Sequence, residues 1–170
     1  MMRRGMLRFW KYHGLGNDFV LVEGPLMGPA RARRVCDRRR GIGADGVVTI
    51  LPPRTPGSAV EMHIYNPDGS VAEMCGNAIR CLARHLAETR GLEGRIRIDT
   101  GAGTKECTLH RGTGACAATV AAMRRGDVRP DTPVEVRLPG GALTISVSAD
   151  LARVTMRGPA ERVFAGEAQL

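Results

Sequence analysis

Aromatic residues are scarce in this chain, which has one Trp, two Tyr and three Phe among 170 residues. A core must therefore be built from aliphatic side chains and methionine, and the apolar content of 43% is that of a globular protein. Proteins that bind single-stranded nucleic acid stack bases on aromatic rings, so the shortage argues against that class of partner. Only Lys11 and Lys105 are lysines, and the net charge of +8 comes from arginines spread along the chain, which we interpret as solvated surface.

Paired cysteine motifs are also absent. The five cysteines are odd in number and include no Cys-x-x-Cys pair, which argues against a disulfide framework and a zinc site. Free thiols fit a reducing compartment, so we expect a cytoplasmic protein. The apolar stretch at residues 6–10 is too short for a signal-peptide core, and no run has the length of a membrane-spanning helix.

The spacing of apolar residues and turn signals predicts a chain of α/β (α+β) class. Strands are expected over residues 7–14, 19–22, 47–51, 60–65, 96–98, 134–138 and 143–147, with shorter strands at 154–156 and from 163. Helices are expected over residues 29–40, from Cys75 to a stop at Gly91, and over 114–123; the last is apolar nearly all round and should be buried.

Two stretches, residues 74–81 and 110–116, read as imperfect copies of one another. Each places a glycine and a small polar residue at the start of an alanine-rich run predicted to be helical. Cys75 directly precedes the glycine of the first copy, whereas Arg111 occupies that place in the second. Free N–H groups and the dipole at a helix N-terminus favour a thiolate, so Cys75 is a candidate base. Two such thiols would supply a base and an acid across one carbon atom, but this chain has only the first.

Four short motifs occur in a fixed order around Cys75: HGLGNDF at residues 13–19, RGIGADG at 40–46, YNPDGS at 65–70 and CGN at 75–77. In this order they resemble the diaminopimelate epimerase family. Residues 112–118 and 138–141 resemble the C-terminal part of the same family.

The resemblance implies two similar α/β domains, each a curled mixed sheet around a central helix, with the active site between them. It implies an isomerase that inverts the α-carbon of L,L-diaminopimelate to the meso form in lysine and peptidoglycan synthesis. Neither a metal nor a cofactor is implied. By position, Cys75 is the catalytic thiol of the first domain, while the implied substrate-binding residues are Asn17, Asn66, Gly76, Asn77, Gly112 and Thr113.

The resemblance is broken between Thr104 and Gly112, where the family has most of its second domain. A Gly-Asn-Pro-His segment, a further Asn and a Glu-Arg pair are missing there. We therefore expect a near-complete N-terminal domain at residues 1–104, a remnant of the second domain at 105–158, and a C-terminal strand at 159–170 that returns to the first domain. An internal deletion, a frameshifted junction and a degenerate paralogue are alternative origins.

The remaining cysteines have simpler interpretations. Cys36, Cys81 and Cys116 lie on apolar helix faces and are expected to pack, and Cys107 is too far upstream of the second helix to replace the lost thiol. Four functions stay open: an impaired epimerase, a non-catalytic paralogue that at most binds an amino-acid-like anion, a phenazine-biosynthesis-type isomerase, and a basic nucleic-acid binder. The retained CGN motif disfavours the third, and charge alone supports the fourth. The incomplete second domain also predicts homodimers or self-association.

Overall fold

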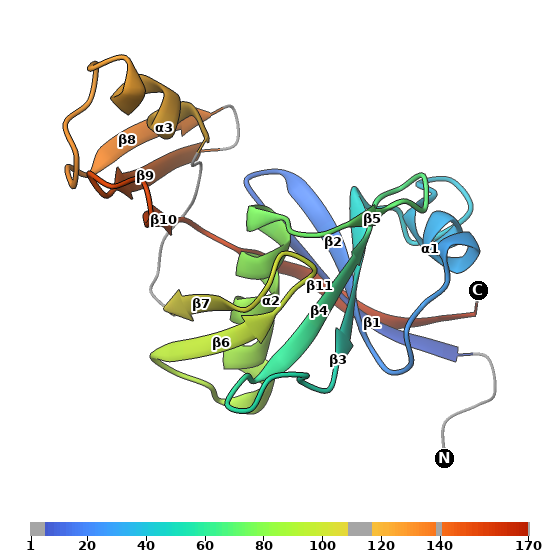
Figure 1. Cartoon of the computed structure of the whole chain (residues 1–170). Coiled ribbons are helices and arrows are strands. Elements are labelled where there is room, and N and C mark those ends of the chain that lie inside the picture. Colours follow the sequence, from blue (N-terminus) through green and yellow to red (C-terminus); the bar gives the residue numbers. More distant parts are fainter. Residues whose placement is uncertain (1–5, 109–116, 139–140, 170) are drawn as a thin grey trace.

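A computed structural model of the chain describes residues 6–108, 117–138 and 141–169 (Figure 1). In chain order the elements are β1 (Met6–Gly14), β2 (Asn17–Glu23), α1 (Pro29–Cys36), β3 (Gly46–Leu51), β4 (Val60–Tyr65), β5 (Val71–Ala72), α2 (Gly76–Arg90), β6 (Arg95–Asp99), β7 (Lys105–Thr108), α3 (Ala117–Arg124), β8 (Val134–Leu138), β9 (Gly141–Val147), β10 (Val154–Arg157) and β11 (Glu161–Gln169). Within these residues, no helix is both long and apolar enough to cross a membrane.

Most strands join one 8-stranded sheet in the order β11-β1-β2-β3-β4-β6-β7, with β5 paired to β4. The pairs β2–β3 and β4–β6 are parallel and the other pairs are antiparallel. The α/β class expected from the sequence, with a mixed sheet, is therefore confirmed.

Helix α2 is the central helix of this sheet. Its apolar positions fall at helical spacing, so Ala78, Leu82 and Leu86 are fully buried on one face. They pack in one core with apolar side chains of β1, β2, β3, β4 and β6. Burial of each leucine side chain contributes about 1.5–3 kcal/mol to the stability of the folded state. The helix ends where Gly91 takes a left-handed conformation at φ 64°, as the sequence predicts.

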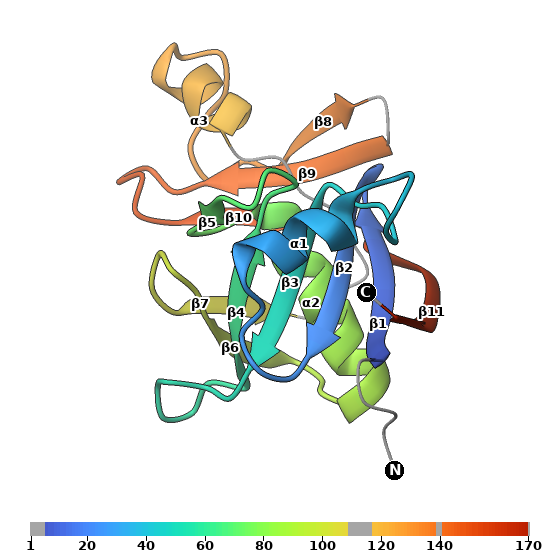
Figure 2. The ribbon, with the colours of Figure 1, turned by 90° about the vertical axis from the view of Figure 1, so that its right-hand side faces the viewer.

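Helix α1 lies on the opposite face of the sheet from α2 (Figure 2), over a second core that contains Val35 and Val47. We expected this helix to reach residue 40, but it ends at Cys36. The Asp37 carboxylate accepts the N–H groups of Arg39 and Arg40, at 2.8 and 2.9 Å, and so offers the backbone a turn in place of another helical turn.

A small sheet, in the order β10-β9-β8, forms with α3 a C-terminal unit beyond the N-terminal end of α2 (Figures 1 and 2). Its strands bury Leu143, Ile145 and Val147. The predicted hairpin is confirmed. Helix α3 buries Thr119 but leaves Ala122 and Met123 half-buried. The expectation of a helix buried all round is wrong for these two residues, because α3 packs against one side of a three-stranded sheet.

Both chain connections of this unit lead into strands of the large sheet. Strand β7 pairs with β6, Arg95 opposite Thr108, so the large sheet continues past Thr104, where we expected the first domain to end. The sheet continues because residues 105–108, whose burial alternates along the strand, form an antiparallel pair with β6. Strand β11 pairs with β1, Met6 opposite Gln169. The large sheet therefore contains both early and late parts of the sequence.

Candidate functional site

The N-terminus of α2 presents a thiol beside uncapped backbone donors. Cys75 is the N-cap residue, with extended backbone angles and no side-chain cap hydrogen bond. The N–H of Ile79 donates to the Cys75 carbonyl at 3.0 Å and is the first bond of the helix. The N–H groups of Gly76, Asn77 and Ala78 therefore have no acceptor within the helix. The Cys75 side chain is half-buried against the main core. This arrangement suits a small anion next to a sulfur atom.

A tight hairpin turn brings β2 to this helix end. Leu15 and Gly16 form its two-residue loop with φ values of 60° and 83°, the conformation that matches the twist of a hairpin. The turn lies close to α2, since a Cβ atom placed on Gly14 would be 2.8 Å from Nη2 of Arg80. The first residue after the loop, Asn17, therefore faces the start of the helix.

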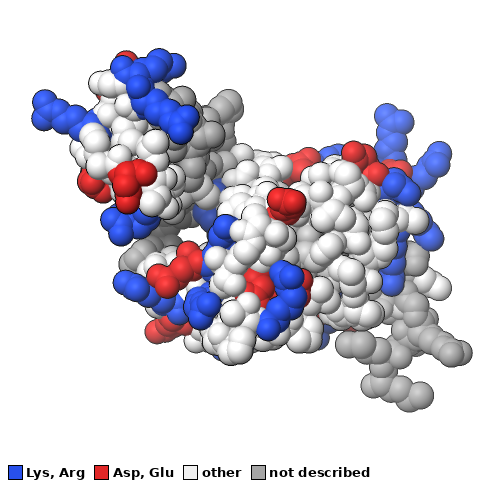
Figure 3. All heavy atoms as spheres, viewed as in Figure 1, with Lys and Arg blue, Asp and Glu red and all other residues white. Residues whose placement is uncertain are grey.

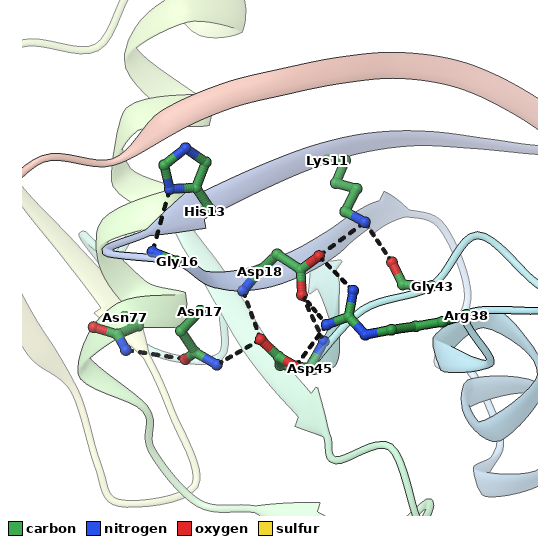
Figure 4. Close-up of polar contacts among 9 residues, drawn as sticks. All are labelled: Lys11, His13, Gly16, Asn17, Asp18, Arg38, Gly43, Asp45 and Asn77. Atoms are coloured by element: carbon green, nitrogen blue, oxygen red, sulfur yellow. Dashed lines mark hydrogen bonds and ion pairs between the residues drawn. The ribbon is translucent and has the colours of Figure 1, made fainter. Parts of the chain in front are cut away.

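Three side-chain hydrogen bonds form a series from α2 through Asn17 to Asp45, and Figure 4 draws two of them. Nδ2 of Asn77 donates to Oδ1 of Asn17 at 2.9 Å, and Nδ2 of Asn17 donates to Oδ2 of Asp45 at 3.0 Å. Within α2, Nη2 of Arg80 donates to Oδ1 of Asn77 at 2.8 Å. The structure thus brings together two of the sequence-predicted binding residues, Asn17 and Asn77.

Asp45 is held in turn by a cluster of charged groups (Figure 4). Its carboxylate accepts the N–H of Asp18 at 3.0 Å and pairs with Arg38 at 2.7 Å. Asp18 also pairs with Arg38, and with Lys11 at 2.8 Å. Burial alone would raise the pKa of Asp18, but the hydrogen bonds from Arg38 and Lys11 outweigh burial and hold that pKa well below its usual range. Asp18 is therefore ionised at neutral pH, and its backbone N–H and Arg38 together hold the Asp45 carboxylate in position.

Asn66 lies apart from this hydrogen-bond chain. It begins the turn between β4 and β5, where its Nδ2 donates to Oγ of Ser70 at 2.9 Å. The Ser70 hydroxyl donates to Asp68 at 2.6 Å. The structure therefore does not hydrogen-bond Asn66 to Asn17 or Asn77, and its role in binding stays a prediction.

The C-terminal unit contacts this site at two points. The Cε atom of Met156 lies 2.7 Å from where a Cβ on Gly76 would stand, and Cδ2 of Leu15 lies 3.1 Å from the corresponding position on Gly141. The second copy of the repeated stretch, with Arg111, Gly112 and Thr113 at the start of its expected helix, lies outside the described residues.

The other thiols differ from Cys75 in their surroundings. Cys36 and Cys81 are buried, as expected, and burial raises their pKa values to about 11 and about 12. Cys107 is half-buried in β7, where burial, together with the charge of Glu106, raises its pKa to about 11. Cys116 lies outside the described residues. The three described thiols, those of Cys36, Cys81 and Cys107, therefore lack the open helix-end position of Cys75.

Sequence reasoning missed the charged residues that support the site. Asp18 and Asp45 are part of the two Gly-rich motifs, and their acidic type inside otherwise small-residue turns was the available signal. Arg80 falls one helical turn after Gly76, to whose carbonyl it donates at 3.0 Å. Arg80 also follows Asn77 by three positions, so the two share a face of the predicted helix, and this spacing was the available signal.

Comparison with known proteins gives a consistent family. The model of the diaminopimelate epimerase family matches residues 9–111. A diaminopimelate epimerase from Synechocystis is 31% identical over 280 residues, covering 96% of this chain and 99% of that protein. One from Synechococcus elongatus is 53% identical over 109 residues, covering 61% of this chain and 39% of that protein. The first alignment is longer than the 170-residue chain, so a large internal block of the relative has no counterpart.

Solved structures agree in fold. A hydroxyproline epimerase from Agrobacterium vitis has a TM-score of 0.71 at 11% identity and covers 100% of this chain and 94% of its own. A phenazine biosynthesis family protein from Enterococcus faecalis has a TM-score of 0.69 at 12% identity and covers 97% and 100%. These similarities show the fold alone, whereas the family match and the sequence relatives show that the chain belongs to the diaminopimelate epimerase family.

Proposed function

We propose that this chain is a cofactor-independent isomerase of the diaminopimelate epimerase type with strongly impaired turnover. Its reaction would be inversion of L,L-diaminopimelate at one α-carbon to give the meso form for lysine synthesis. The observation that supports this most directly is the position of Cys75 at the uncapped end of α2, beside Asn17 and Asn77.

In this proposal the Cys75 thiolate removes the α-proton and becomes a thiol. The electron pair left on the α-carbon spreads into the carboxylate, which gains negative charge. The free N–H groups of Gly76 and Asn77 bind that charge more strongly in the transition state than in the ground state, so they accelerate the step. Removal and return of the α-proton on the face next to Cys75 therefore need only this helix end and one thiolate.

Inversion needs a second group that delivers a proton to the opposite face. Arg111 stands in the corresponding place of the second copy. A guanidinium keeps its proton in proteins, so it can neither deliver that proton to the α-carbon nor act as the base for the reverse reaction. We therefore expect proton exchange at the α-carbon to be faster than inversion.

The test is to incubate the chain with L,L- and with meso-diaminopimelate in D₂O. We expect mass spectrometry to detect slow deuterium uptake and chiral chromatography to detect little inversion. Cys75→Ala should abolish uptake. Cys107→Ala, which removes the other half-buried thiol among the described residues, should not. Inversion at the rate of a complete relative would disprove the impairment.

A non-catalytic paralogue is the second candidate. The Met156 methyl lies against Gly76 at the helix mouth, where a substrate carboxylate would bind. Ligand binding without any deuterium uptake would favour this candidate. The Cys75-Gly76-Asn77 motif argues against a phenazine-type isomerase, because that isomerase does not use the thiol pair.

We also propose that the chain is cytoplasmic and self-associates, with no nucleic acid or membrane as partner. Strand β11 is at the edge of the large sheet and exposes Val163 and Phe164 by 51% and 45%. Exposed apolar side chains on an unpaired strand edge favour association with a second copy.

A further inference from the structure

The hydrogen-bond chain from Arg80 to Asp45 has a fixed direction. A guanidinium can only donate and an ionised carboxylate can only accept. Arg80 therefore requires the oxygen of the Asn77 amide to face it, and Asp45 requires the nitrogen of the Asn17 amide to face it. The bond between the two amides, from Nδ2 of Asn77 to Oδ1 of Asn17, agrees with both requirements. Neither amide can rotate by 180° without placing donor against donor or acceptor against acceptor.

This direction sets what the two amides can offer a ligand. A carboxamide has two N–H donors and an oxygen with two lone pairs. Asn17 uses one N–H on Asp45 and one lone pair on Asn77, while Asn77 uses one N–H on Asn17 and one lone pair on Arg80. Each amide keeps a second N–H that none of these three bonds uses. The helix end is therefore supplemented by side-chain donors whose orientation cannot reverse.

We propose that Asp45 is a positioning residue: with Arg80, it fixes the amides of Asn17 and Asn77 so that the site presents N–H donors and selects a carboxylate-bearing ligand. Arg38 and the N–H of Asp18 hold Asp45 in place. The identity of the ligand as diaminopimelate rests on the proposed function. The fixed orientation of the amides does not rest on it.

The first experiment reads the amides directly in the full chain, by the side-chain amide resonances of ¹⁵N-labelled protein. We expect one Asn17 Nδ2 proton of the unmodified chain to be shifted downfield and protected from exchange with water. Asp45→Ala should remove both effects. The control Asp127→Ala should retain both, because Asp127 is an exposed aspartate that pairs with Arg125 after α3. Unchanged Asn17 resonances in Asp45→Ala would overturn the proposal.

A second experiment reverses the direction of one bond, and it stays informative if Asp45→Ala fails to fold. Asn17→Asp alone should lower the melting temperature at pH 7, because two carboxylates then face each other. Adding Asp45→Asn should restore it in part. The exchanged pair can bond in the opposite sense, but the Asp18 N–H loses its acceptor, which is the same Asp45 oxygen that accepts Asn17. Affinity for meso-diaminopimelate, measured by calorimetry, should remain at least about tenfold weaker in the double variant, because residue 17 has lost its donor.

The outcomes separate the two proposals. If the double variant recovers affinity as well as stability, ligand binding does not depend on the direction of the hydrogen bonds between Arg80 and Asp45. The positioning role is then wrong. If the unmodified chain binds no diaminopimelate, the proposed function fails, and the amide resonances still decide whether Asp45 orients Asn17.

Discussion

The thioether methyl of Met156 lies against Gly76, with Cε 2.7 Å from where a Cβ would stand. The two residues come from different units of the chain: Met156 from β10 of the small sheet, and Gly76 from the first position of α2. Because Gly76 directly follows Cys75, we expect the methyl group to cover part of the surface from which a reagent or substrate reaches the sulfur. A thioether is flexible, so this cover can move without a change in the backbone.

Shortening Met156 should therefore make Cys75 more accessible. We expect Met156→Ala to increase the rate of Cys75 alkylation by iodoacetamide several-fold, as measured by peptide mapping after timed quenching. Val154→Ala is the matched control, because Val154 is an exposed residue of the same strand. Equal rates in both variants would show that the methyl group does not limit access.

Cys75 should react before the buried thiols in the unmodified chain. The pKa values of Cys36 and Cys81, about 11 and about 12, leave fewer than roughly one thiolate in a thousand at pH 7.5, and burial also blocks the reagent. Cys75 is half-buried at a helix end with free N–H groups. Modification of Cys81 ahead of Cys75 under native conditions would contradict the geometry of this helix mouth.

The helix mouth was predictable because its signals are local. The sequence around Cys75 combines a small-residue start, apolar residues at helical spacing and a terminal Gly91, all within one helix. The early end of α1 was missed because a side chain, that of Asp37, competes with the helical backbone.

The supporting network was missed for a different reason. The bonds from Asn17 to Asp45 and from Asn77 to Asn17 span 28 and 60 residues. No local pattern specifies such pairs, since each depends on the turn and helix being brought together by the sheet. The sequence did not predict that β7 joins the large sheet for the same reason, because this pairing depends on the edge that β6 presents in the folded chain.

Acid should destabilise the large sheet through His85. Its ring is fully buried, lies 4.7 Å from the Trp10 ring, and has Nδ1 3.4 Å from the Tyr12 hydroxyl. Burial lowers the pKa of His85 below its usual 6.5. The charged groups that also act on it are Glu23, Arg90, Glu88 and Arg162.

The direction of this effect follows from the lowered pKa. Below pH 6.5 the unfolded chain binds a proton at His85 that the folded chain does not, so the unfolded state is favoured. Stability should be complete above pH 6.5 and fall as the pH drops toward the folded pKa, by at most about 1.4 kcal/mol per pH unit. Urea titrations at pH 7.5 and 5.5 test this. His85→Gln should be less stable at pH 7.5 but lose less between the two values; an equal loss in both proteins would exclude His85 as the cause.

Self-association should depend on the outer edge of β11. Val163→Glu places a charge on the exposed apolar surface of this strand and should shift the chain toward monomers in sedimentation velocity. Leu26→Glu is the control, because Leu26 is equally exposed, at 52%, but lies in the connection between β2 and α1. A chain that is already monomeric at high concentration, or variants that associate alike, would contradict this role of β11.

Arg111→Cys alone should not restore inversion. The substitution returns a thiol to the second copy, and it removes a permanently charged group that cannot exchange protons. The block that the Synechocystis relative has and this chain lacks would still be absent. A reacting carbon misplaced by about 1 Å costs on the order of a hundredfold in rate, so a second thiol without the groups that orient the substrate adds little. Chiral chromatography should detect no more inversion than in the control Arg124→Cys, which adds a thiol on α3. Substantial rescue by Arg111→Cys and not by the control would mean that the remaining residues of this chain already orient the substrate.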